Sequence, residues 1–247
     1  MKRLFRLALL ALSAGPLVCL AAGTTVTYKV DGASYEGFYI SPSANAPLVI
    51  LVHDWDGLND YEIKRSEMLA AMGYAVFAAD LFGAGVKPTE MDHMKALTGA
   101  LYRDRGKMRA LMQGAVDAAK AQGANTSNAV AAGYCFGGAV VLEFARAGAD
   151  LKGFTTFHGG LKTPDGQDYS QAKGRYLILH GSADTAIPME QFARLATELE
   201  AAGLPHEMVT YSGAPHAFTV FGSKRYREDA DNKSWAQFSE FLSATLN

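Results

Sequence analysis

The chain has 247 residues, 49% of them hydrophobic, and a formal net charge of −2 at pH 7. A nearly neutral chain lacks the basic surface with which proteins bind nucleic acids or anionic membranes, so we expect a small-molecule partner and no nucleic acid. No internal repeat, low-complexity run or charge block divides the sequence. These features favour a single domain.

The N-terminal segment, residues 1–22, is typical of a secretory signal peptide. Lys2, Arg3 and Arg6 precede an apolar run that begins at Leu7, and small residues end the segment. The run is short for a membrane span, so we expect no stable membrane insertion of the mature chain. We predict export to the periplasm or the extracellular space.

Cleavage after Ala22 leaves residues 23–247 as the domain and removes Cys19. We expect no lipid anchor at Cys19, because Val18 stands where lipidation requires a small residue. The mature chain then holds one cysteine, Cys135. A solitary thiol in an oxidising compartment forms no internal disulfide and is liable to oxidation. Its presence is better explained by chemistry than by packing.

The predicted strands begin with an antiparallel hairpin, because residues 24–28 and 34–40 alternate apolar and polar side chains around Asp31-Gly32. The later apolar runs are continuous, which is typical of strands buried on both faces of a parallel sheet. These runs cover residues 47–53, 74–79, 129–134, 154–157, 176–180 and 207–211.

Helical patterns separate the strands. They cover residues 60–72, about 89–121, 139–148, 188–202 and about 225–246. Asp60 is a plausible N-cap for the first of them, and an interruption of the second is expected near Gly99 or Gly106. The alternation implies right-handed crossovers and an α/β fold, a mostly parallel twisted sheet of about eight strands with helices on both faces. Functional residues of such sheets gather beyond the carboxyl ends of the strands.

The sequence GYCFGG, residues 133–138, joins an apolar run to a helical pattern. It predicts the strand, sharp turn and helix that form the nucleophile elbow of an α/β hydrolase. Glycines are needed beside the nucleophile because larger residues would collide with the crossing strand and helix. The alternative is an ordinary turn in which Cys135 is a small buried residue.

A nucleophilic thiol needs a histidine base, and the base needs an orienting carboxylate. In α/β hydrolases the chain order is nucleophile, acid, histidine. His206 begins the last strand, whereas His216 follows its carboxyl end, and Asp184 follows the carboxyl end of strand 176–180. We therefore predict a triad of Cys135, Asp184 and His216. The alternatives are a surface loop for His216 and a turn or helix cap for Asp184.

The oxyanion formed on attack requires two preset donors. We assign them to the backbone N–H groups of Phe136 and Trp55, although the Trp55 ring is equally compatible with a pocket wall or a core position. His158, Phe82 and Phe218 lie close to the same strand ends and are candidates for the pocket lining. No His or Cys spacing resembles a zinc site, and we expect neither a metal nor a cofactor.

Five segments together resemble the dienelactone hydrolase family, a branch of the α/β hydrolases with a Cys, Asp, His triad. They are HDWDGLND from His53, GYAVFAADLFG from Gly73, GYCFGG from Gly133, HGSADTAIP from His180 and GAPHAF from Gly213. The segments follow the family's order over nearly the whole mature chain. The resemblance implies cofactor-free hydrolysis of a small ester, lactone or thioester through an acyl-cysteine.

The resemblance also implies an acid that pairs with the resting thiol and receives its proton. Asp54 occupies that position, one methylene shorter than the usual Glu, and the alternative is an acid that only orders the loop. Family members that cleave dienelactone clamp the substrate carboxylate with two arginines. The matching positions here hold Ala84 and Val220, which cannot bind an anion. Unless Arg225 or Lys224 reaches back, we expect a different substrate.

A second function class is a ligand-binding protein on an inactive hydrolase scaffold. Loss of a triad member would favour it. The sequence retains a cysteine, an acid and a histidine in the required order, which favours an enzyme.

Overall fold

The computed structural model describes residues 22–246. The predicted signal peptide, with Cys19, therefore lies outside the described residues except for Ala22. Within residues 22–246, no helix is both long and apolar enough to cross a membrane.

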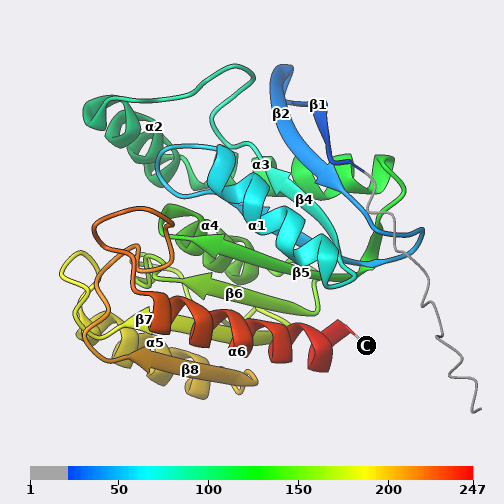
Figure 1. The fold of residues 1–247 in the computed structure, drawn as a ribbon. Helices are drawn as coiled ribbons and strands as arrows, with labels where there is room; N and C mark the ends of the chain where they lie inside the picture. The colour runs from blue at the N-terminus through cyan, green and yellow to red at the C-terminus, as the bar shows by residue number, and fades with distance from the viewer. Residues whose placement is uncertain (1–21, 247) are drawn as a thin grey trace, which may run out of the picture.

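The described chain forms one eight-stranded sheet with the order β1-β2-β4-β3-β5-β6-β7-β8 (Figure 1). β1 pairs with β2 and β2 with β4 in antiparallel orientation, and all other neighbours pair parallel. The strands are β1 Thr24–Val30, β2 Ala33–Ile40, β3 Pro47–Val52, β4 Ala75–Ala79, β5 Asn125–Tyr134, β6 Gly153–Phe157, β7 Arg175–Gly181 and β8 His206–Tyr211. The predicted hairpin and mostly parallel sheet are confirmed.

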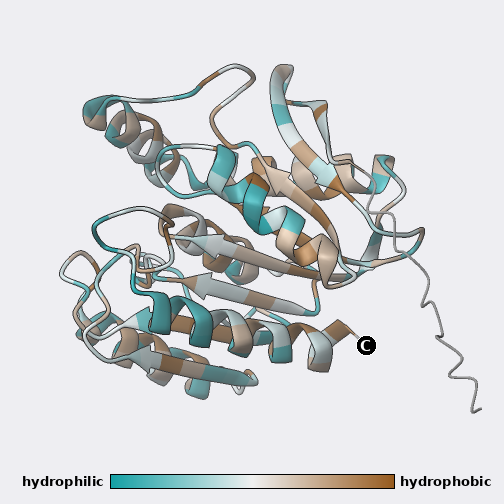
Figure 2. Ribbon diagram, viewed as in Figure 1, coloured by the Kyte–Doolittle hydropathy of each residue, from teal (hydrophilic) through white to brown (hydrophobic). Residues whose placement is uncertain are grey.

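Helices cover both faces of this sheet. They are α1 Asp60–Ala71, α2 Met91–Arg103, α3 Arg105–Ala121, α4 Phe136–Arg146, α5 Met189–Ala201 and α6 Glu228–Leu246. α1 and α6 pack on one face, and α3, α4 and α5 pack on the other (Figure 1). Hydrophilic residues lie on the outward turns of α1 and α6 (Figure 2), so each helix buries one side only.

One predicted helix boundary is wrong. The N-cap of α1 is Asn59, whose side chain accepts a hydrogen bond from the Tyr61 N–H while the Glu62 side chain accepts one from the Asn59 N–H. This reciprocal capping box satisfies two N–H groups that the helix cannot pair. The interruption predicted near Gly106 is confirmed: the long helical region breaks two residues earlier, at Asp104. Asp104 caps α3 by accepting from the Lys107 N–H at 2.9 Å.

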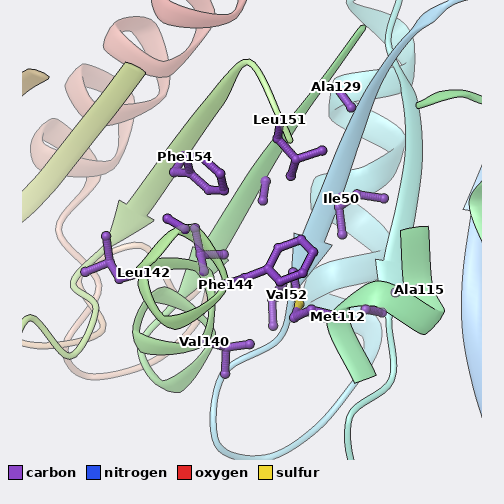
Figure 3. Close-up of a cluster of buried hydrophobic side chains, with 14 of the residues drawn as sticks. Ile50, Val52, Met112, Ala115, Ala129, Val140, Leu142, Phe144, Leu151 and Phe154 are labelled. Atoms are coloured by element: carbon purple, nitrogen blue, oxygen red, sulfur yellow. The ribbon is translucent and has the colours of Figure 1, made fainter. Parts of the chain in front are cut away.

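The central strand β3 explains why a parallel strand is continuously apolar. Residues 48–52 are all 0% exposed. Their side chains point alternately to the two faces of the sheet. Leu48, Ile50 and Val52 pack toward α3 and α4, and the other two pack toward α1 and α6. Figure 3 shows Ile50 and Val52 in the first group, among buried side chains that include Met112 of α3 and Phe144 of α4. Full burial of one such side chain is worth about 1.5–3 kcal/mol, so β3 anchors the sheet.

Candidate active site

The turn between β5 and α4 places Cys135 in a strained backbone conformation. Cys135 has φ 50° and ψ −110° and is the N-cap of α4. A non-glycine residue adopts such a conformation only when its surroundings enforce it. The Cys135 N–H donates to the Phe157 carbonyl at 3.0 Å, which ties the turn to β6. The strand, turn and helix predicted from GYCFGG are present.

The flanking glycines are required by close packing of backbone against backbone. A Cβ on Gly133 would lie 2.3 Å from the backbone of Gly137, and a Cβ on Gly137 would lie 2.4 Å from the Val52 carbonyl oxygen. No side chain fits at these distances. The two glycines therefore allow the first turn of α4 to lie against β5 and the end of β3, with the thiol at the helix N-terminus.

The structure brings Cys135, His216 and Asp184 together. The Nε2 atom of His216 lies 3.0 Å from the Cys135 Sγ atom, and its Nδ1 atom lies 2.7 Å from Asp184 Oδ2. These residues follow β5, β8 and β7 in that order, so the parallel sheet assembles them at one edge. The alternatives of a surface-loop histidine and an acid that serves only a turn do not describe this arrangement.

Asp184 is held in place by its own turn. Its Oδ1 atom accepts from the N–H groups of Ala186 and Ile187, both at 2.9 Å, which leaves Oδ2 for His216. Burial opposes ionisation here, but the hydrogen bond and charge of His216 and the two backbone donors outweigh it and lower the pKa of Asp184. The carboxylate is therefore charged at neutral pH and orients the imidazole ring.

The protonation state of the pair formed by Cys135 and His216 follows from these contacts. An ionised carboxylate only accepts hydrogen bonds, so His216 carries its proton on Nδ1 and presents Nε2 as an acceptor. Burial raises the pKa of the Cys135 thiol well above its usual range. The resting thiol therefore keeps its proton and faces the Nε2 atom of His216.

A cavity of about 310 Å³ opens over the thiol. Its walls come from the loop after β3, from α2, from the elbow and from the loops after β6, β7 and β8. The lining residues are Asp54, Trp55, Thr98, Tyr102, Cys135, Phe136, Gly160, Ala186, Ile187, His216, Ala217 and Arg225. Trp55 and Phe136, assigned as backbone donors, both lie at this cavity.

Three residues predicted for the pocket do not line it. His158 and Phe218 are 0% exposed, and His158 Nε2 lies 2.8 Å from the Thr219 hydroxyl. Phe82 packs its ring on His53, with centroids 4.6 Å apart. All three lie near the expected strand ends, but His158 and Phe218 turn into the core, and Phe82 is half-buried against it.

Several wall residues have only a weak signal in the sequence. Thr98 and Tyr102 are four residues apart on α2, the spacing of one helix face, but the strand end that this face covers is set by packing. Arg225 lines the cavity. Ala84 and Val220, which match the family's substrate-binding arginines, are not among its lining residues.

The acid after the strand-end histidine is buried and orders its loop. Asp54 Oδ1 accepts from the Asp56 N–H at 3.1 Å, and the Asp54 carbonyl accepts from His53 Nδ1 at 2.6 Å. Burial, with the neighbouring Asp56 and Glu62 carboxyls, raises the pKa of Asp54 to about 9. Burial likewise raises the pKa of Glu62 to about 8. A protonated Asp54 at neutral pH favours the loop-ordering alternative over a proton acceptor for the thiol.

Within the described residues, no group of three or more His, Cys, Asp or Glu side chains could hold a metal ion. The functional side chains that line the cavity are the Cys135 thiol, the His216 imidazole, the Asp54 carboxyl, the Arg225 guanidinium and the hydroxyls of Thr98 and Tyr102.

Comparison with known proteins shows the family and the fold of this chain. The model of the dienelactone hydrolase family matches residues 35–246. The chain belongs to the dienelactone hydrolase family. Its fold is that of an α/β hydrolase, and its membership makes it a dienelactone hydrolase-like hydrolase.

Among solved dienelactone hydrolase-like structures, a promiscuous phosphotriesterase from metagenomic libraries superposes with a TM-score of 0.85 and 28% identity, over 92% of this chain and 99% of that one. Among curated relatives, a mouse carboxymethylenebutenolidase homolog is 27% identical over 194 residues, 76% of each chain. The protein usf of Aquifex pyrophilus is 25% identical over 230 residues, 89% of this chain and 99% of its own.

Proposed function

We propose that this protein hydrolyses small esters, lactones or thioesters through an acyl-cysteine on Cys135. The observation that carries the proposal is the continuous series of hydrogen bonds from Cys135 through His216 to Asp184 beside a cavity of about 310 Å³. Membership in the dienelactone hydrolase family supports the same reaction class.

In the first half of the reaction, His216 Nε2 takes the thiol proton as Cys135 Sγ bonds to the substrate carbonyl carbon. The carbonyl electron pair moves to oxygen, and the backbone N–H groups of Phe136 and Trp55 stabilise the resulting oxyanion. Asp184 stabilises the imidazolium that forms. When the oxyanion collapses, the bond to the leaving group breaks, and His216 gives its proton to that group.

In the second half, water replaces the leaving group. His216 Nε2 takes a proton from this water as its oxygen bonds to the acyl carbon. Collapse of the second oxyanion breaks the bond from carbon to Sγ, and the thiolate recovers the proton from His216. The sum of both halves is one ester and one water converted to one acid and one alcohol, with Cys135 and His216 restored.

The proposal keeps a substrate other than dienelactone, because Ala84 and Val220 replace the two arginines with which family members hold a substrate carboxylate. Arg225 does reach the cavity over Cys135, so one arginine is present there in place of that pair. Export to the periplasm or the extracellular space by residues 1–22 remains part of the proposal. The second candidate, a ligand-binding protein on a hydrolase scaffold, is less well supported, because the hydrogen-bonded Cys135, His216 and Asp184 would have no purpose in it.

The test is a comparison of the mature protein with Cys135→Ala and Cys135→Ser on aryl esters, lactones and thioesters. A phosphotriester is added because a structural relative is named as a phosphotriesterase. We expect the wild type to turn over at least one acyl class and the alanine variant to lose about 10³-fold or more in kcat/KM. Intact mass spectrometry of the quenched reaction should show the acyl group on the wild type only. Equal turnover by wild type and Cys135→Ala contradicts the proposal.

A further inference from the structure

A second cavity, of about 470 Å³, adjoins the one over Cys135. Tyr102, Gly160 and Ile187 line both cavities, so these residues form the border between them. Gly160 contributes no side chain to this border, and a Cβ there would lie 3.2 Å from the Ala139 Cβ in the second cavity. A substrate longer than the first cavity therefore has an adjoining space to enter.

The charged residues of the second cavity are mostly basic. Arg105, Arg146 and Lys162 line it, against one acid, Asp165. Among the described residues, Arg225 is the one Lys or Arg side chain that lines the first cavity, and the one acid of that lining, Asp54, holds a proton at neutral pH. The second cavity is thus the more basic of the two and attracts anions.

The basic excess is built into the packing beneath the second cavity. Glu143 is 0% exposed and receives three guanidinium groups, Arg105 at 2.9 Å, Arg109 at 2.7 Å and Arg146 at 3.0 Å. One carboxylate balances one of these three charges. Burial opposes the ionisation of Glu143, but the hydrogen bonds and charges of the arginines outweigh it and lower its pKa. The cluster therefore keeps a positive charge.

Arg105 and Lys162 have hydrogen-bond donors available for a ligand, whereas Arg146 does not. Arg146 bonds to Gln167, Tyr169 and Glu143 and is buried, which makes it structural. Arg105 is bonded to Glu143 through one nitrogen only, and its guanidinium lies 5.5 Å from the Tyr102 ring centroid. This stacking holds Arg105 beside the border. The Lys162 ammonium makes no hydrogen bond or ion pair with the residues described.

We propose that the second cavity is a subsite for an anionic group, a carboxylate or a phosphate, at the far end of an extended substrate, bound by Arg105 with Lys162. This inference rests on the proposed hydrolysis at Cys135 and adds the substrate class. Arg105 provides the planar donor pair that matches two oxygens of an oxyanion, and Lys162 adds a mobile point charge. The site is separate from positions 84 and 220.

The experiment measures kcat and KM for activated esters of increasing chain length that end in a carboxylate, in a phosphate or in a neutral methyl ester. Wild type, Arg105→Gln and Lys162→Gln are compared. Glu143 keeps Arg109 and Arg146 when Arg105 is replaced, so the variant should fold. Arg103→Gln, on an exposed residue that lines neither cavity, is the matched control. Arg225→Gln tests the first cavity as the anion site.

We expect the wild type to prefer anionic esters above a threshold length. Arg105→Gln should raise KM for those esters about tenfold, the value of one charge-assisted hydrogen bond, with kcat and the neutral series unchanged. The preferred terminus, carboxylate or phosphate, identifies the anion. Two results overturn the subsite. One is an equal change in KM for neutral and anionic esters in Arg105→Gln, and the other is a KM for anionic esters that rises in Arg225→Gln and not in Arg105→Gln.

Absence of turnover on every ester, neutral ones included, would instead mean that the proposed hydrolysis has failed. In that event, binding still tests the subsite. A long dicarboxylate should raise the thermal midpoint of Cys135→Ala, and this rise should be lost when Arg105→Gln is added.

Discussion

His158 and Thr219 are joined by a hydrogen bond of 2.8 Å between the imidazole Nε2 and the hydroxyl oxygen. The same hydroxyl lies 2.7 Å from the Tyr61 hydroxyl on α1, and Thr219 is three residues beyond His216 on one loop. The ring of His158 in turn lies against that of His216, with centroids 5.3 Å apart. The buried contacts of Thr219 therefore hold the loop that positions the proposed base.

Thr219→Val should loosen this loop. Replacement of the hydroxyl by a methyl group leaves His158 Nε2 without its buried partner, at a cost of about 1–3 kcal/mol in the free energy of unfolding, whereas the Tyr61 hydroxyl still accepts from Arg65 Nε at 3.3 Å. We expect a lower kcat because His216 loses its fixed orientation, with little change in KM. Thr219→Ser keeps the hydroxyl and should restore kcat. Thermal unfolding and steady-state kinetics check both statements, and a serine variant no better than valine would contradict them.

Asp184→Asn should remove most of the activity without unfolding the protein. The amide can donate to Nδ1, which places the ring proton on Nε2 and leaves no acceptor for the thiol. We expect kcat to fall on the order of 10³–10⁴-fold on whichever neutral ester the wild type cleaves. Asp229→Asn, on an exposed acid outside the triad and outside both cavities, is the control. An asparagine variant within a few-fold of wild type would falsify the orienting role.

Gly137→Ala should disrupt the elbow, because the added Cβ would lie 2.4 Å from the Val52 carbonyl oxygen. Neither backbone segment can move without displacing β3 or α4. We expect a large loss of thermal stability or no soluble protein. Gly99→Ala is the matched control, since it lies inside α2, where a Cβ meets only the flexible Arg103 side chain at 3.3 Å. That variant should gain up to about 1 kcal/mol from helix propensity, measured by chemical denaturation.

Asp54 should make the protein less stable as pH rises. Burial raises its pKa to about 9, so between about pH 4, its pKa in the unfolded chain, and pH 9 the folded state holds a proton that the unfolded state releases. The contribution of Asp54 to the free energy of unfolding is therefore largest below about pH 4 and is lost as pH rises toward 9. Asp54→Asn removes the titrating group. The thermal midpoint of this variant, relative to that of the wild type, should therefore rise as the pH increases. The exposed Asp60→Asn should show no such gain, and parallel curves for Asp54→Asn and wild type would contradict the assignment.

Sequence patterns were sufficient to predict the sheet, its order of strands and helices along the chain, and the three residues of the proposed triad. The reason is physical: apolar periodicity reports local structure, and parallel strands bring their carboxyl ends to one edge. Cys135, Asp184 and His216 each follow such an end, so their meeting could be inferred without coordinates. The break in the long helical region was predicted to within two residues, whereas the cap at Asn59 was missed because several neighbouring polar residues can serve as caps.

Tertiary structure alone decided which side chains line the cavity and what charge they carry. His158 and Phe218 stand near the right strand ends but turn into the core, while Tyr102 on α2 covers the site. The cluster of Arg105 with Glu143 depends on residues 38 positions apart in sequence. Such contacts depend on how α2, α3 and the loop after β8 pack over the sheet. Local sequence patterns do not predict that packing, because it joins residues that are far apart in the sequence.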